Sequence, residues 1–125
     1  MKGQYFLKDK KAQHYQMYST GGGVGDPTYY IAMSPAPYWC YTKQLTQEEL
    51  FAAHAYWNDE TRLFVFNNKP DMKQYDYILY KNEWYEVTRV DTTDDYNGET
   101  FVYAKDAKGG NKPRPQYIKP YGWQP

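Results

Sequence analysis

Residues 75–91, "YDYILYKNEWYEVTRVD", carry the pattern that decides the fold. Apolar and polar side chains alternate on both sides of Lys81–Asn82, which is typical of two strands joined by a tight turn. We predict strands near 75–80 and 84–91, with Lys81–Asn82 at the turn. A tyrosine-rich hairpin of this kind indicates a mainly β protein.

The hairpin is followed and preceded by further strand signals. Residues 94–105, "DDYNGETFVYAK", contain Asn97–Gly98, the dipeptide preferred in type I′ turns, and predict a last strand at about 99–104. Upstream, "ETRLFVFNN" at 60–68 alternates with period two but is apolar on both faces. This strand is therefore central in a sheet, or one of its faces meets a partner.

The N-terminal third predicts shorter elements. "QYFLKDKKAQHYQMY" reads as strands near 4–8 and 13–18 joined by a charged turn at Asp9–Lys10. Residues 18–37 are expected to form a loop and an extended insertion, because prolines near its end exclude a helix. "YWCYTK" then predicts a short strand at about 38–42.

One short helix is predicted at 46–57, within "LTQEELFAAHAYW". Thr46 as N-cap and Glu49 three residues later form a capping box, in which each side chain binds a backbone N–H at the helix start. The second half of the helix is apolar nearly all round, so the helix is either wedged inside the domain or in contact with a neighbour. The candidate contact residues are Phe51, Tyr56 and Trp57.

These elements predict one domain at 1–106, a small β-barrel or sandwich with the short helix inserted. Residues 107–125 hold four prolines and three glycines, which indicates an irregular C-terminal tail ordered only by contacts. The tail aromatics Tyr117, Tyr121 and Trp123 are candidate anchors on a partner.

The composition favours protein contact over other functions. Among 125 residues, 16 are tyrosine, whose flat apolar ring and polar hydroxyl suit half-wet surfaces. Fifteen basic and 15 acidic side chains cancel, which argues against a dominant attraction to nucleic acid or to a membrane. A single cysteine excludes an internal disulfide. We expect a soluble protein from a reducing compartment, because no apolar leader or span is present.

No pattern predicts an enzyme, a metal or a cofactor. Cys40 could be paired with His14 or His54 as nucleophile and base, but their surroundings are those of packed residues. The acidic loop at 91–99 lacks the spacing of a calcium loop. The adjacent Glu48 and Glu49 point about 100° apart on a helix and cannot converge.

Nucleotide and nucleic-acid binding are also disfavoured. The stretch "STGGGVGDPTYY", residues 19–30, lacks the P-loop spacing and its strand-to-helix context. Several tyrosines could stack bases, but acidic residues are interleaved with them, whereas a groove that follows phosphates should be basic. The tyrosines in question are Tyr75, Tyr77, Tyr85 and Tyr103.

Residues 38–106 resemble the head–tail joining proteins, also called head closure or stopper proteins, of long-tailed bacteriophages. The similarity runs through "YWCYTKQLTQEELFAAHAYWNDETRLFVFNN" and "YDYILYKNEWYEVTRVDTTDDYNGETFVYAKD". Seven positions fall in order onto the family's strand pattern, with asparagine in place of glycine at the turn. They are Ile78, Tyr80, Asn82, Tyr85, Val87, Val90 and Asp91.

The resemblance implies a structural virion protein of the neck, made in the bacterial host cytoplasm. Such proteins form a ring, commonly of twelve copies, below the portal and adaptor proteins and above the tail. The ring retains packaged DNA, which it contacts through its channel. An early loop of the family faces that channel, and the glycine loop of this chain has a comparable position, although a plain connector is the alternative. Its residues are Gly21, Gly22, Gly23, Val24, Gly25 and Asp26.

Two other functions stay open at this point. One is a tail terminator or tail-completion protein, which would share a small β fold but bind the end of the tail tube. The other is an SH3-like or OB-like adaptor that binds peptide or nucleic acid.

Overall fold

A computed structural model describes residues 7–19, 29–46, 60–67, 71–91, 98–107 and 112–124. The strands are β1 (Lys10–Ser19), β2 (Tyr29–Met33), β3 (Tyr38–Gln44), β4 (Glu60–Asn67), β5 (Tyr77–Tyr80), β6 (Glu83–Asp91), β7 (Glu99–Asp106) and β8 (Ile118–Lys119). The helical structure within these ranges is a 3-10 turn, η3 (Pro115–Tyr117). The predicted helix at 46–57 lies, beyond Thr46, outside the described residues.

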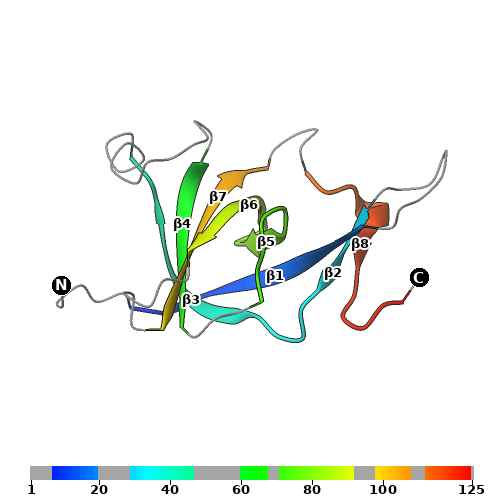
Figure 1. The fold of residues 1–125 in the computed structure, drawn as a ribbon, viewed down its shortest axis with the longest axis horizontal. Helices are drawn as coiled ribbons and strands as arrows, with labels where there is room; N and C mark the ends of the chain where they lie inside the picture. The colour runs from blue at the N-terminus through cyan, green and yellow to red at the C-terminus, as the bar shows by residue number, and fades with distance from the viewer. Residues whose placement is uncertain are drawn as a thin grey trace.

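Six strands close into an antiparallel barrel in the order β3-β4-β7-β6-β5-β1 (Figure 1). The first residues of β1 close it, because Lys10 pairs with Cys40 and Ala12 pairs with Tyr38 on β3. This confirms the predicted mainly β fold and decides between a barrel and a sandwich. Full closure leaves these six strands without an open edge over their paired lengths.

The barrel interior is apolar and follows from strand alternation. Phe64, Phe66, Ile78 and Val102 are each 0% exposed and belong to one contiguous cluster. The opposite face of β4 is buried as well, in agreement with its doubly apolar sequence. β4 lies between β3 and β7, as expected for a central strand.

The turn that joins β5 to β6 is the one predicted. Lys81 and Asn82 have φ angles of 51° and 64°, the left-handed values that a type I′ turn needs at both central residues. β6 then carries a bulge between Val87 and Arg89. The extra residue, Thr88, donates a hydrogen bond from its hydroxyl to the Tyr103 carbonyl at 3.0 Å, which keeps the ladder connected across the irregularity.

The two remaining strands extend the sheet beyond the barrel, on the right of Figure 1. The second half of β1, residues 15–19, pairs antiparallel with β2, and it leaves the barrel after Tyr15, which still pairs with Tyr77 on β5. β2 pairs on its other side with β8, in parallel, through Ile31 with Ile118 and Ala32 with Lys119. We call residues 15–19, β2 and residues 112–124 the arm.

The structure corrects one prediction in these regions and refines two others. Lys10 begins β1 and does not lie in a turn, because the pairing with β3 needs extended backbone there. The insertion at 18–37 contains a true strand, β2, since the prolines follow it and do not interrupt it. The C-terminal tail, expected to be irregular, contributes η3 and β8 because β2 offers it a sheet edge.

Candidate functional site

The arm has two faces, and each is covered by a different part of the molecule. Strand alternation places Met17, Tyr29 and Ile31 on one face and Tyr18 and Tyr30 on the other. The first face packs against the outer wall of the barrel, in a cluster built around four buried residues. These are Tyr15, Ile31, Tyr77 and Ala107.

The tail covers the second face and the edge. The Trp123 ring meets the Tyr30 ring edge-on, with centroids 4.7 Å apart, and Lys119 Nζ lies 4.8 Å from the Trp123 centroid. Tyr117 meets Tyr29 edge-on at 5.6 Å. Two of the three predicted tail anchors, Tyr117 and Trp123, thus contact the chain's own β2, which holds the tail in place.

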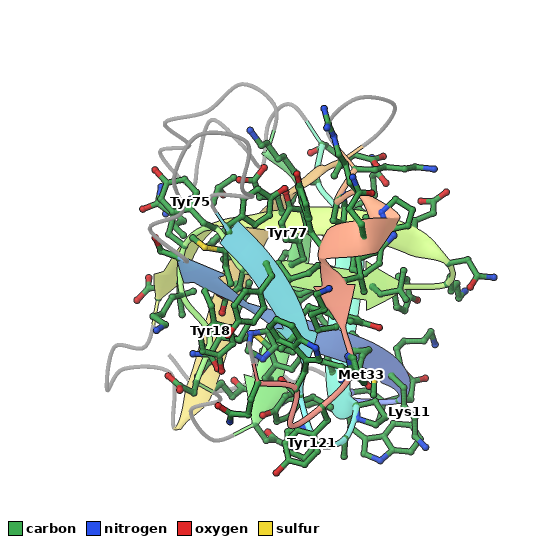
Figure 2. The ribbon with its side chains drawn as sticks, turned by 90° about the vertical axis from the view of Figure 1, so that its right-hand side faces the viewer. Lys11, Tyr18, Met33, Tyr75, Tyr77 and Tyr121 are labelled. Carbon is green, nitrogen blue, oxygen red and sulfur yellow. The ribbon has the colours of Figure 1, made fainter. Side chains whose placement is uncertain are left out.

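The third predicted anchor, Tyr121, is 62% exposed. Together with Tyr18, which is 39% exposed and stacks on Tyr30 at 5.2 Å, it places aromatic surface on the outside of the arm. Figure 2 looks onto this end of the molecule and labels both tyrosines. A pocket of about 280 Å³ lies between them and is also lined by Trp123.

A buried polar network joins the arm to the barrel. His14 Nε2 lies 2.8 Å from Asp76 Oδ2, and the Ser34 hydroxyl lies 2.8 Å from His14 Nδ1. A carboxylate oxygen accepts, so His14 Nε2–H donates to Asp76. All three side chains are buried. We call His14, Ser34 and Asp76 the joint.

Asp76 is the centre of the joint because it accepts three hydrogen bonds. Its Oδ1 accepts from the Met17 N–H at 2.9 Å, and its Oδ2 accepts from the Lys73 N–H at 3.0 Å in addition to His14. The Ser34 N–H donates to the His14 carbonyl at 2.9 Å. The joint therefore connects β1, the residue after β2 and the segment before β5 at the point where the arm leaves the barrel.

The hydrogen bonds run in the order serine, histidine, aspartate, which is also the order in a hydrolase triad. A triad needs an accessible hydroxyl and N–H groups directed at the developing oxyanion. Ser34 is 9% exposed, and its own N–H is bonded to the His14 carbonyl. We interpret the joint as a connection between two parts of the fold.

The pairing of Cys40 with a histidine, considered from the sequence, finds no support in the geometry. Cys40 is 0% exposed in the barrel cluster, and burial is the main cause that raises the pKa of its thiol to about 12. His14 has Asp76 and Ser34 as its partners instead. His54 lies outside the described residues.

A second pocket lies between the arm and the outer wall of the barrel. It has a volume of about 340 Å³ and is lined by Met17, Ser19, Tyr29, Tyr75, Tyr77 and Glu86. We call it the tyrosine pocket. Burial, the Glu86 charge and a hydrogen bond with Tyr29 all raise the pKa of Tyr77, in that order. Because Tyr29 and Tyr77 both line it, the pocket lies between β2 of the arm and β5 of the barrel.

The four tyrosines considered for base stacking do not share one surface. Tyr85 is 4% exposed in the barrel interior, and Tyr103 is covered by Arg89, whose guanidinium carbon lies 3.9 Å from the ring centroid. Tyr75 and Tyr77 line the tyrosine pocket. The sequence pointed to two of the pocket's residues, but it missed Tyr29 and the joint residues Ser34 and Asp76.

The other predicted contact residues lie outside the described part of the chain. These are the glycine loop and the helix residues Phe51, Tyr56 and Trp57. Across the described ranges, no three His, Cys, Asp or Glu side chains gather in a way that could hold a metal ion. No helix in those ranges is long and apolar enough to cross a membrane. No protein-family model and no curated protein matches the sequence.

Proposed function

We propose that the protein is a structural assembly subunit that contacts neighbouring proteins through its arm. In this role it acts as a head closure or head–tail connector protein of a long-tailed bacteriophage. It assembles as a ring, commonly of twelve copies, between the portal or adaptor proteins and the tail proteins. The glycine loop Gly21–Asp26 lines the channel and meets the packaged DNA.

The exposed aromatic surface of the arm is the observation that carries the proposal. The barrel has its own apolar core, so the arm is not needed to complete it. The arm instead presents Tyr18 and Tyr121 outward, and tyrosine is enriched among the residues that dominate protein interfaces. Beside them, β8 at the end of the sheet offers a strand edge.

The sequence resemblance supports the more specific role. It covers residues 38–106, and β3, β4, β5, β6 and β7 of the barrel lie within that range. The resemblance implies a small β-barrel with an inserted helix and long loops, and the described strands form a closed barrel.

Fractionation of phage particles tests the proposal. DNA-filled heads and free tails are purified from the phage that encodes the chain, and the protein is located by mass spectrometry. We expect it in DNA-filled heads in several copies per particle. Presence in free tails alone would favour the tail terminator, and absence from both fractions would overturn a virion role.

Substitutions test the part played by the arm. The double variant Tyr18→Ser, Tyr121→Ala should fold normally, because both side chains are exposed. It should no longer attach to phage heads that lack the protein. Trp39→Ala is the matched control, since Trp39 is 55% exposed but lies on β3 of the barrel. Equal joining by the double variant and by the wild type would contradict an interface on the arm.

A further inference from the structure

The tyrosine pocket brings together groups from both regions of the molecule. Met17 and Ser19 come from β1, Tyr29 comes from β2, and Tyr77 and Glu86 come from β5 and β6. Ligand pockets in proteins usually measure about 300–1,000 Å³. At about 340 Å³ this one has room for a small molecule or a single side chain.

The wall of the tyrosine pocket is aromatic and carries one carboxylate. Three tyrosines line it, and the electron-rich face of a tyrosine ring attracts weakly hydrated cations. Among the described residues that line the pocket, Glu86 is the charged one. Because burial, Glu86 and Tyr29 raise the pKa of Tyr77, its phenol stays neutral in the physiological range. The negative charge of the described wall is therefore that of Glu86.

Tyr75 has a backbone conformation that needs an explanation. Its φ angle is 79°, in the left-handed region that side chains other than glycine rarely adopt. Hydrogen bonds hold it there: the Tyr75 N–H donates to the Val87 carbonyl at 2.9 Å, and the Val87 N–H donates to the Asp76 carbonyl at 2.8 Å. The side chain, 53% exposed, forms part of the pocket wall. Glycine would suit the backbone better, but it would remove an aromatic wall.

Glu86 is held beside the pocket by strand register. It pairs directly with Tyr77 on β5 and with Lys105 on β7, so the three side chains lie in one row on the same face. Lys105 Nζ lies 3.7 Å from Glu86 Oε1, which is a long ion pair between partly exposed groups. Lys105 therefore holds the carboxylate weakly and competes with any other cation for it.

We propose that the tyrosine pocket binds an organic cation, either a methylated ammonium or a guanidinium group. Tyr29, Tyr75 and Tyr77 form the aromatic wall, and Glu86 supplies the opposite charge. The same chemistry is offered by a small quaternary amine and by a basic side chain of a partner protein. This site is independent of the proposed assembly role, because it depends only on the pocket's own groups.

Titration of the full-length protein with matched probes tests the site. The cationic probes are choline and N-acetyl-arginine amide, and the neutral probe is 3,3-dimethylbutan-1-ol, which has the shape of choline without its charge. Binding is followed by NMR through the Trp84 indole resonance, because the Trp84 ring lies edge-on to Tyr77 at 6.1 Å. We expect saturable binding of at least one cation and binding of the neutral probe that is about tenfold weaker.

The two cationic probes distinguish the two sources. Tighter binding of choline indicates a small methylated amine as the ligand. Tighter binding of the arginine derivative indicates a basic side chain of a protein. Equal binding of the neutral and cationic probes, or no saturable binding of any probe, would overturn the proposal.

Variants assign the effect to the pocket. Glu86→Gln should weaken cation binding about fivefold and leave the neutral probe unaffected, since only charge is lost. Tyr75→Ala should weaken cation binding about threefold through loss of one aromatic wall.

Lys105→Met should strengthen cation binding about two- to threefold by removing the competing ammonium. Tyr121→Ala, on the other face of the arm, is the control and should change nothing; unchanged binding in Glu86→Gln would contradict the assigned counter-charge.

Discussion

The barrel and the arm belong to one sheet but are stabilised by different forces. The barrel encloses side chains such as Phe64 and Ile78, which are 0% exposed and surrounded by other apolar groups. The arm has no interior of its own. One of its faces lies against the barrel wall, the other lies under Trp123, and a buried hydrogen-bond network around Asp76 connects it to the barrel. We therefore expect the barrel to be destabilised most by substitutions that leave a cavity in its core. The arm should be destabilised most by substitutions that remove a hydrogen bond or a ring contact.

The largest effect should come from emptying the barrel. Phe64→Ala removes a fully buried ring that contacts Phe66, Tyr80 and Tyr85 edge-on or stacked. We expect a loss of about 3–5 kcal/mol in the free energy of unfolding, because a cavity replaces the ring. Urea denaturation measures it, with Trp39→Ala as the exposed control. A loss below about 1 kcal/mol would show that the described core does not dominate stability.

The next effect should come from breaking the joint. Asp76→Ala leaves the His14 ring N–H and the Met17 and Lys73 amides without their buried acceptor. We expect a loss of about 3 kcal/mol in the free energy of unfolding, and the arm should lose more stability than the barrel. Asp76→Asn keeps the shape and part of the accepting capacity, so it should cost less than the alanine variant. Equal stability of Asp76→Ala and the wild type would contradict the connecting role of the joint.

High pH should weaken the barrel through its buried thiol. The pKa of Cys40 rises from 9.0 to about 12 in the folded barrel. The folded state thus keeps a proton that the unfolded chain loses, so stability is complete below pH 9 and falls as the pH rises towards 12. From about pH 8 to about pH 10.5 we expect a loss of about 2 kcal/mol from this thiol. Cys40→Ala should remove that part of the pH dependence when the urea midpoints are compared.

The smallest effect should be confined to the arm. Trp123→Ala removes the ring that covers Tyr30. We expect the free energy of local opening in the arm to fall by about 1 kcal/mol. This should appear as about fivefold faster hydrogen exchange at the Ile31 and Ile118 amides. Exchange at barrel amides such as that of Val102 should not change. Equal acceleration in both regions would mean that barrel and arm open together, and the distinction between them would fail.

Local patterns predicted most of the barrel. Alternation and turn chemistry located β3 to β7. Of these strands, β5, β6 and β7 are consecutive neighbours whose turns are marked in the sequence, whereas β4 pairs with β3 and β7. The turn at Lys81–Asn82 was predicted from the alternation on either side of it, and not from its left-handed backbone, for which glycine is the commoner residue. The closure of the barrel by Lys10–Ala12 was not predicted, since a charged start of a strand resembles a turn.

The arm was largely beyond prediction. β8 has two residues and no periodicity, and it forms only because the edge of β2 is there to receive it. The joint brings His14 to Asp76 across 62 residues of sequence and to Ser34 across 20, and no local signal reports such distances. The tyrosine pocket depends on the same long-range packing. The excess of tyrosine in the composition predicted half-buried aromatic contacts, but it did not say which tyrosines would meet.

The continuity of β1 has a mechanical consequence. A single strand runs from the pairing that closes the barrel at Lys10 to the end of the arm at Ser19, so no hinge separates the two regions along that strand. A load applied to the arm is transmitted along the strand and resisted by several backbone hydrogen bonds in shear. A partner protein that binds the arm therefore also fixes the orientation of the barrel.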